Sequence, residues 1–432
     1  MNISRYNKDL TREEVICFGR VAELFLMASV KPFPALRPKP ELASEICELP
    51  YDVLSSAEAR KAVEGRPQSF FHVSKPEVDL AEGTDPFDPS VYAKGRENFD
   101  RLISEALLIQ DEQPCYYLYR QIMGAHSQIG LVAVASCEEY DQGIVKKHEF
   151  TRPDKEDDRV RHMEALDSQT GPVFLTYPAN ATLDTLFESL TSGAPEIDFV
   201  GKDEVRHSAW TVTDPSQIES IEAQFKAIPT LYIADGHHRS AAASRVAKAR
   251  NGQNHSSDFL TVLFPHNQMQ ILAYNRFVKD LNGLTAEALL ERIGEIATIE
   301  PQTESVEPSK KHRLGMFLGG AWYRLEFKES VRSAADPVER LDVSILQQHI
   351  LNPLLGIADP RTSHRVAFVG GIRGNGELER LVNAAGDGVA FSMYPTDIED
   401  LMAIADADQI MPPKSTWFEP KLRDAMFCHM LR

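Results

Sequence analysis

The stretch "DGHHR" places residue types suited to phosphate chemistry at five consecutive positions, Asp235 to Arg239. Gly236 lets the backbone approach an anion closely, and the guanidinium of Arg239 can bind two phosphate oxygens at once. His237 and His238 add hydrogen-bond donors, whereas Asp235 could hold Mg²⁺ or orient a hydroxyl nucleophile. The alternative is that the histidines are buried and hydrogen-bonded and that Asp235 only caps a helix. Five such residues together favour a phosphate site, with Asp235 as both a catalytic and a metal-binding candidate.

A second candidate group lies in residues 146–166, "KKHEFTRPDKEDDRVRHMEAL". His148 and Glu149 follow a strand-like lead and precede a proline-interrupted turn, so we expect them at the edge of an element. A carboxylate there could act as a general base toward an alcohol, which makes Glu149 and His148 catalytic candidates and Arg152 a substrate-binding candidate. The HExxH zinc motif is absent, because position 152 is Arg. The later charges suit either a solvated helix face or the site itself: Lys155, Glu156, Asp158 and Arg159.

Three further stretches carry donor groups on turns. "PYDVLS" offers Tyr51 and Asp52 as substrate-binding candidates, against the alternative of an ordinary turn with a helix cap. "FVGGIRGNGELERL" is a glycine-rich turn in which Arg373 could bind phosphate, although neither GxGxxG nor Walker A spacing is present. "MPPKSTWFEPKL" is a rigid, proline-flanked loop that offers Lys414 for phosphate and Trp417 for substrate. If these loops reach the "DGHHR" stretch, the site lies between domains.

The elements around "DGHHR" explain why it would bind an anion. The apolar run "TLYIA" predicts a buried strand before it, and "SAAASRVAKAR" after it is rich in good helix formers. The motif is therefore predicted at a strand-to-helix turn, where free N–H groups and the helix dipole attract phosphate. Other strands are predicted from "PCYYLYRQ", "QIGLVAVASCEEY" and "PVFLTYP", and "TVLFP" with "QMQILAYNRFV" predicts a hairpin. Helices are predicted from "SSAEARKAVEG" and "LTAEALLERIGEI".

This pattern predicts an α+β protein with mixed sheets. Residues 1–27 are expected to form a loosely ordered N-terminal extension, and 28–305 an N-terminal and central α+β region. The polar, proline-containing segment around 301–312 is the best linker candidate, and 313–432 is expected to form a C-terminal α+β region.

Composition excludes several classes of protein. The 432-residue chain carries a formal net charge of -18, which argues against affinity based on neutralising a nucleic-acid backbone. No apolar run approaches the roughly 20 residues that cross a bilayer, so we expect a cytoplasmic protein without a membrane partner. Its five cysteines are scattered singly, which predicts free thiols.

Several of these stretches together resemble a bacterial and archaeal family catalogued as a domain of unknown function. The resemblance runs from about residue 30 to the C terminus and rests on the following segments: "KPFPALRP", "PYDV", "KKHEFTRPDKEDDR", "YIADGHHR", "YNRFVKDL", "FVGGIRG" and "MPPKSTWFEPKL". More distantly, "DGHHR" is similar to the phosphate-binding signature of the ParB and sulfiredoxin superfamily, which includes the free serine kinases. This resemblance implies a ParB/sulfiredoxin-like core around the strand–helix turn.

The same resemblance implies a function. In the superfamily the motif holds the terminal phosphates of a nucleotide, and an upstream glutamate is the base. Carried over, Gly236, His238 and Arg239 bind phosphate, Asp235 assists with metal or catalysis, and Glu149 is the base. The interval from Glu149 to Asp235 is longer than is usual there, so either an insertion is present or the base lies elsewhere. His237 replaces sulfiredoxin's reactive cysteine, which argues against sulfinic-acid repair.

The leading hypothesis is therefore a phosphotransferase that uses ATP or ADP with Mg²⁺ to phosphorylate a small hydroxyl substrate, best L-serine. Two alternatives remain at this stage. The same site used with water is a phosphatase of a small phosphomonoester such as phosphoserine, and a site without turnover is a nucleotide-binding regulator. A purely structural interaction protein is disfavoured by the number of donor-rich turns.

Overall fold

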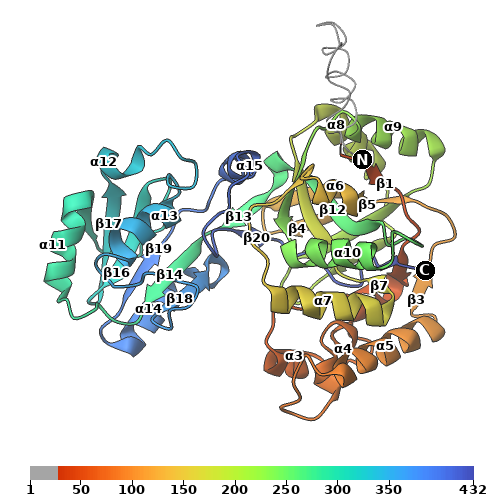
Figure 1. Cartoon of the computed structure of the whole chain (residues 1–432), viewed down its shortest axis with the longest axis horizontal. Helices are drawn as coiled ribbons and strands as arrows, with labels where there is room; N and C mark the ends of the chain where they lie inside the picture. Colours follow the sequence, from red (N-terminus) through yellow and green to blue (C-terminus); the bar gives the residue numbers. More distant parts are fainter. Residues whose placement is uncertain (1–27) are drawn as a thin grey trace, which may run out of the picture.

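The computed structural model describes residues 28–432, which form two lobes joined by a narrow middle region (Figure 1). The predicted N-terminal extension, residues 1–27, lies outside the described residues. Among the described residues no helix has the length and apolar character needed to cross a membrane. Four cysteines within this part of the chain are buried free thiols: Cys47, Cys115, Cys137 and Cys428.

The larger lobe is built on a nine-stranded mixed sheet. Its strands follow the order β6-β11-β8-β12-β5-β4-β10-β9, and β1 pairs with β5. Two pairings, β11 with β6 and β12 with β8, are parallel, and the others are antiparallel. The strands are β1 (Val30–Lys31), β4 (Tyr116–Met123), β5 (His126–Ser136), β6 (Val145–Lys146), β8 (Val173–Tyr177), β9 (Ile197–Val200), β10 (Arg206–Val212), β11 (Leu231–Asp235) and β12 (Asp258–Pro265).

Helices cover this sheet and orient the turn that follows β11. The alanine-rich helix α10 packs against α7, and α7 packs in turn against α5 (Figure 1). Ser55 and Glu58 form a capping box at the start of α3, in the stretch "SSAEARKAVEG" where the sequence predicted a helix. The helices are α2 (Ala43–Ile46), α3 (Ser56–Ala62), α4 (Phe71–Ser74), α5 (Pro89–Ser104), α6 (Cys137–Asp141), α7 (Pro153–Leu166), α8 (Ala181–Leu190), α9 (Pro215–Phe225) and α10 (His237–Ala249).

The smaller lobe is an antiparallel six-stranded sheet in the order β15-β17-β16-β19-β14-β18. Its strands are β14 (Tyr274–Val278), β15 (Ala297–Gln302), β16 (Arg313–Leu318), β17 (Ala321–Phe327), β18 (Val366–Gly370) and β19 (Val389–Ser392). Its helices are α11 (Ala286–Ile296), α12 (Glu329–Arg332), α13 (Asp342–Leu346) and α14 (Gly374–Ala385), while α15 (Ile398–Asp406) lies between the lobes, where Asp406 contacts Lys146 and Tyr232 of the larger lobe (Figure 1). Two mixed α+β lobes confirm the predicted fold class.

The lobes are divided at a different place from the one the sequence suggested. The predicted linker, 301–312, connects β15 and β16, which both belong to the six-stranded sheet. The predicted hairpin after β12 is also wrong. The segment β13 (Gln270–Leu272) pairs with β20 (Trp417–Glu419) instead, while β14 joins β18 and β19. A polar segment therefore indicates a surface connection, but it does not distinguish a loop within a lobe from a linker between lobes.

The C-terminal segment returns to the larger lobe, so the predicted unit 313–432 is not continuous in space. After β20, β21 (His429–Met430) pairs with β7 (Ser168–Gln169). Phe418, Leu422 and Phe427 join an apolar core that extends into both lobes. The remaining elements are β2 (Leu36–Pro38), which pairs with β3 (Leu108–Gln110), and the short helices η2 (Pro40–Leu42), η3 (Pro76–Asp79), η4 (His266–Gln268), η5 (Gln347–Leu351) and η6 (Gly371–Arg373).

Candidate functional site

The "DGHHR" residues form the predicted strand-to-helix turn. β11 ends at Asp235, Gly236 is the N-cap residue, and α10 begins at His237. The N–H groups of Arg239 and Ser240 donate to the Gly236 carbonyl over 2.9 and 3.0 Å. Because a helix offers no earlier carbonyl to its first N–H groups, the start of α10 can donate hydrogen bonds to an anion at its positive end.

Replacing Gly236 with Ala should lower the free energy of unfolding by about 1–3 kcal/mol. Gly236 has φ +99°, and a Cβ atom there would lie 3.0 Å from the guanidinium of Arg239. Both the backbone conformation and the contact disfavour a side chain. Thermal unfolding measures the effect, and Gly252→Ala, also at positive φ but with only Ser257 near the added Cβ, is the matched control for steric contact. Equal losses in the two variants would contradict the role of the Arg239 contact.

Arg239 lies beneath the turn. Its side chain is 7% exposed, its NH1 group donates to the carbonyl of Pro172, and its NH2 group lies 3.9 Å from Asp235 Oδ2. Asp424 is buried nearby and carries a pKa raised to about 7, because burial outweighs the effect of Arg239. The predicted phosphate ligand is thus engaged with protein groups and does not line the cavity described below.

Asp235 is paired with a lysine that sequence reasoning missed. Lys421 Nζ lies 3.4 Å from Asp235 Oδ2, and both side chains line the same cavity. Burial alone would raise the pKa of Asp235, but Lys421 and Arg239 bring it well below its ordinary value. Asp235 is therefore ionised at neutral pH. Lys421 stands in the quoted stretch "MPPKSTWFEPKL", where a second lysine was the available signal.

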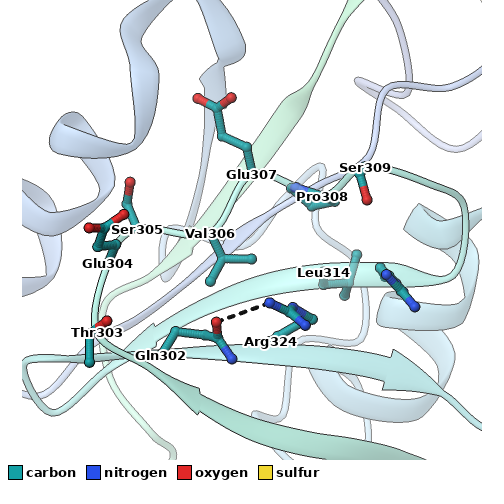
Figure 2. A pocket seen from close by; sticks show the side chains of 11 residues that line it. Gln302, Thr303, Glu304, Ser305, Val306, Glu307, Pro308, Ser309, Leu314 and Arg324 are labelled. Carbon is teal, nitrogen blue, oxygen red and sulfur yellow. Dashed lines mark hydrogen bonds between the residues drawn. The ribbon is translucent and has the colours of Figure 1, made fainter.

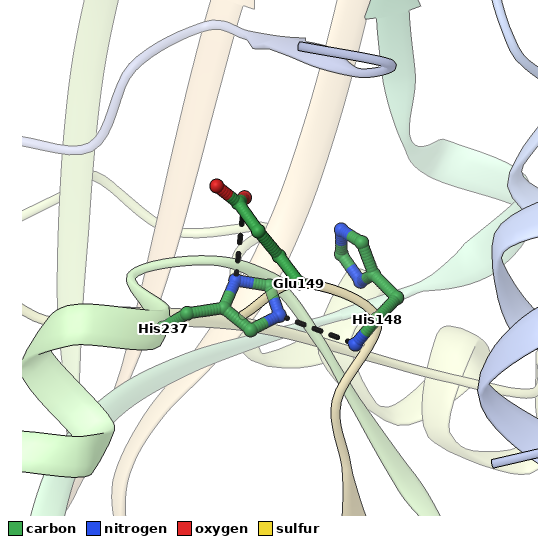
Figure 3. Close-up of side chains that lie close together, drawn as sticks. All are labelled: His148, Glu149 and His237. Atoms are coloured by element: carbon green, nitrogen blue, oxygen red, sulfur yellow. Dashed lines mark hydrogen bonds and ion pairs between the residues drawn. The ribbon is translucent and has the colours of Figure 1, made fainter. Parts of the chain in front are cut away.

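His148, Glu149 and His237 form a compact cluster (Figure 3). His148 and Glu149 lie on the loop between β6 and α7, and His237 begins α10. The backbone N–H of His148 donates to His237 Nε2 over 3.4 Å, and His237 Nδ1 lies 4.0 Å from Glu149 Oε2. The rings of His148 and His237 meet edge to face, with their centroids 4.5 Å apart. The predicted pair 148–149 and the predicted turn thus meet in space.

Burial sets the protonation of this cluster. It lowers the pKa of His148 to about 4, and together with His148 it lowers the pKa of His237 well below its ordinary value. Both imidazoles are thus neutral at pH 7. Glu149 keeps about half of its side-chain exposure, and partial burial raises its pKa while Lys414 opposes the rise. Glu149 therefore has the features of a general base that is open to a ligand.

A cavity of about 200 Å³ lies at the junction of the lobes and joins several predicted residues. Lys414, on the loop before β20, and Trp417, the first residue of β20, line it together with Asp235 of the "DGHHR" stretch. Tyr274, at the start of β14, lines it from the smaller lobe. The lining residues are Asp52, Val53, His148, Glu149, Ala234, Asp235, Tyr274, Met411, Pro412, Lys414, Ser415, Thr416, Trp417, Phe418 and Lys421.

Tyr51 and two charged residues of α7, Asp158 and Arg159, contact one another outside the cavity lining. The guanidinium of Arg159 stacks on the Tyr51 ring at 3.6 Å and pairs with Asp158 at 2.6 Å. Asp158 and Arg159 are buried, so this part of α7 is not a solvated face. Lys155 and Glu156 contact Phe87 and Arg245 instead, outside the cavity lining. Tyr51 thus anchors the segment that carries Asp52 into the cavity.

His238, Arg152 and Arg373 lie outside the cavity lining. His238 Nε2 accepts the backbone N–H of Arg152 over 3.1 Å, while the exposed Arg152 side chain pairs with Asp154. Arg373 is exposed at the end of η6. Gly370, in the same stretch, packs against the Trp417 ring, which a Cβ atom there would approach within 3.0 Å. Gly370 therefore leaves room for a tryptophan ring, and the spacing of glycines in the sequence does not distinguish this role from that of a phosphate loop.

A larger cavity of about 370 Å³ lies in the smaller lobe, along the segment between β15 and β16 (Figure 2). Arg324 is held there by Gln302 over 3.0 Å and by Glu300 over 3.2 Å. None of the predicted site residues lines it. The cavity at the lobe junction is therefore the better candidate site.

Comparisons with known proteins agree with the chain's predicted resemblance. The sequence model of a family described as "Protein of unknown function (DUF1015)" matches residues 30–344. A search of curated proteins gave no match.

Three solved structures to which the chain is similar are a C-terminally truncated SbnI from Staphylococcus aureus, a free serine kinase in complex with AMP, and a conserved hypothetical protein from Pyrococcus furiosus. Their sequence identities are 11%, 10% and 9%, and their TM-scores are 0.37, 0.32 and 0.32. The matches cover 68%, 66% and 68% of this chain and 85%, 86% and 93% of theirs.

Proposed function

The chain belongs to the DUF1015 family, whose function is unknown, and we propose that its inter-lobe cavity transfers a phosphoryl group to a small hydroxyl substrate. One observation carries this proposal. The cavity joins two lysines, which suit an anion, to a carboxylate that suits a hydroxyl proton, and Asp235 in its lining directly precedes the N-cap residue of α10.

The anion side of the cavity consists of Lys414 and Lys421, next to Asp235. Phosphoryl transfer needs fixed positive charge around the transferred group, since charge redistributes over its oxygens in the transition state. Lys421 is held by Asp235, and Lys414 is exposed at the cavity. Lys421 thus takes the phosphate-binding role that the sequence predicted for Arg239, next to the predicted Lys414.

The hydroxyl side consists of Glu149, which accepts the proton of the attacking alcohol. Its raised pKa brings it closer to the operating pH, which is where a general base is most effective. Asp235 stays ionised and is the carboxylate available for Mg²⁺ that arrives with a nucleotide. ATP or ADP is the proposed donor, and the likeness of "DGHHR" to the free serine kinase motif makes L-serine the first acceptor to test.

A phosphatase of a small phosphomonoester is the second candidate, favoured by the size of the cavity. Its volume of about 200 Å³ lies below the roughly 300–1,000 Å³ typical of ligand pockets. Phosphoserine has fewer atoms to enclose than ATP. Water would then take the place of the alcohol, with Glu149 still as the base.

A phosphorus NMR screen separates these candidates. The protein is mixed with Mg²⁺, ATP or ADP, and small alcohols that include L-serine; a second sample contains phosphoserine alone. A new phosphomonoester signal supports the kinase, and inorganic phosphate from phosphoserine supports the phosphatase. Saturable nucleotide binding without either product would contradict both and favour a nucleotide-binding regulator.

Replacing Lys421 with Met should raise the KM for the phosphoryl donor by about 10- to 100-fold, because a charge-assisted hydrogen bond contributes about 1.5–3 kcal/mol. Steady-state kinetics with varied nucleotide measures the effect. The matched control is Lys248→Met on the last turn of α10, where the lysine pairs with Asp141 at the surface. An unchanged KM in Lys421→Met would remove this lysine from the phosphate site.

A further inference from the structure

The His148–Glu149–His237 cluster provides a donor set with a definite metal preference. Its three ligand atoms, two imidazole nitrogens and one carboxylate oxygen, all lie within 4.8 Å of one another. Both histidines are almost fully buried, and His148 Nδ1 has no hydrogen-bond partner among the described residues. An unsatisfied buried polar atom is costly, so such an atom calls for an explanation.

We propose that His148, Glu149 and His237 bind a divalent transition-metal ion of the Zn²⁺ type. Mg²⁺ prefers oxygen ligands, whereas imidazole suits Zn²⁺ and its neighbours in the first transition row. Two histidines, one carboxylate and an open position form the arrangement found in catalytic zinc sites. This site goes beyond the proposed function, because it does not depend on phosphoryl transfer. Metal binding can therefore be tested without measuring turnover. It is also separate from the Mg²⁺ that accompanies a nucleotide.

The geometry requires a small closure of the cluster. Ligands of a tetrahedral zinc ion lie about 3.3 Å apart, given bonds of about 2.0–2.1 Å. Here the upper separation is 4.8 Å, so binding must draw the side chains together. Glu149 lies on a loop and keeps about half of its exposure, which gives it room to move. Figure 3 shows its carboxylate beside the His237 ring, with His148 facing the same space.

Coordination through His237 Nδ1 also fixes its tautomer. The ring proton then lies on Nε2, so Nε2 no longer accepts the hydrogen bond from the His148 N–H and the two donors must move apart. That contact is 3.4 Å long, at the weak limit for a hydrogen bond, so little is lost. A carboxylate has two oxygens, and one ligating oxygen of Glu149 leaves the other for a substrate hydroxyl.

Titration of the metal-free full-length protein with Co²⁺ tests this site. Visible absorption reports coordination of Co²⁺, and Zn²⁺ is then added as a competitor. We expect one Co²⁺ ion per chain, displaced by Zn²⁺ but not by a large excess of Mg²⁺. Glu149→Gln and His148→Ala should each lower the affinity by about 10-fold or more, as loss of even an outer-shell partner does.

The matched control is His238→Ala, which removes the neighbouring imidazole that lies outside the cluster and should leave Co²⁺ affinity unchanged. Circular dichroism confirms that each variant is folded. If His148→Ala misfolds, Glu149→Gln decides, because its half-exposed side chain can be changed without disturbing the core. Absence of Co²⁺ and Zn²⁺ binding to the folded wild type, or unchanged affinity in Glu149→Gln, would overturn the proposal.

Discussion

Replacing Glu149 with Gln should lower kcat for phosphoryl transfer by about 10²- to 10⁴-fold, the contribution typical of a positioned general base. Gln has nearly the same shape but accepts no proton. The KM for the nucleotide should change little, because the proposed phosphate ligands are Lys414 and Lys421 and not Glu149. Steady-state and single-turnover kinetics measure the two parameters separately.

Two controls isolate the proton-transfer role of Glu149. Glu164→Gln changes an exposed glutamate on α7 and should leave kcat unchanged. Because Glu149 also belongs to the proposed metal site, kcat is measured after chelation and again with saturating Zn²⁺. A loss that persists in both conditions belongs to the missing base. A kcat for Glu149→Gln within about 2-fold of wild type would show that Glu149 is not the base. The long interval between Glu149 and Asp235 in the sequence left that alternative open.

The turn and its strand were predictable because their signals are local. An apolar run, a glycine and an alanine-rich run specify strand, turn and helix within about 20 residues, and β11, Gly236 and α10 follow that order. Glu149 and His148 were likewise identified from their own neighbours on the chain. Local patterns indicate which residues are available for chemistry, but they do not indicate which way each side chain points.

Contacts between distant segments decided the rest of the site. Lys421 reaches Asp235 across 186 positions because β20 crosses back to pair with β13. No local pattern encodes that pairing, so this lysine was missed. Trp417 occupies the space that Gly370 of "FVGGIRG" leaves open, whereas the sequence predicted a phosphate loop there. A glycine indicates that another group lies close to the backbone. That group can be an aromatic ring as well as a phosphate.

Arg239 shows the same limit most clearly, since its local sequence suits either of two roles. An arginine in the first turn of a helix can face an anion or fold beneath the turn. The carbonyl of Pro172, which accepts from its guanidinium, belongs to a segment 67 residues away. That contact and the buried Asp424 decide in favour of a structural role, and this role makes a prediction opposite to that for Lys421.

Replacing Arg239 with Ala should lower the free energy of unfolding by about 1–3 kcal/mol, the cost of leaving a buried hydrogen-bond partner unsatisfied. The Pro172 carbonyl loses its donor, and Asp235 and Asp424 lose a nearby cation. Chemical denaturation measures the loss. Arg245→Ala, on the same helix but paired at the surface with Asp157, should cost less than about 1 kcal/mol.

The pH dependence of this loss identifies Asp424 as part of its cause. The folded-state pKa of Asp424, about 7, is raised above its ordinary value of 3.8, so the folded protein binds this proton more tightly. The resulting stabilisation is complete below pH 3.8 and disappears as the pH rises through about 7. Without Arg239 the folded-state pKa should rise further, because Arg239 lowers it.

At pH 5 the folded protein carries neutral Asp424 with or without Arg239, so the variant loses the hydrogen bond to Pro172, packing and the cation beside ionised Asp235, but no charge interaction with Asp424. At pH 8 the wild type holds an ionised Asp424 next to a cation, whereas the variant must keep the proton or bury a less compensated charge. The destabilisation by Arg239→Ala should therefore be larger at pH 8 than at pH 5, and Asp424→Asn should remove the difference. A loss that is equal at both pH values would separate Arg239 from Asp424. A folded Arg239→Ala variant with weakened nucleotide binding and unchanged stability would return this arginine to the phosphate site.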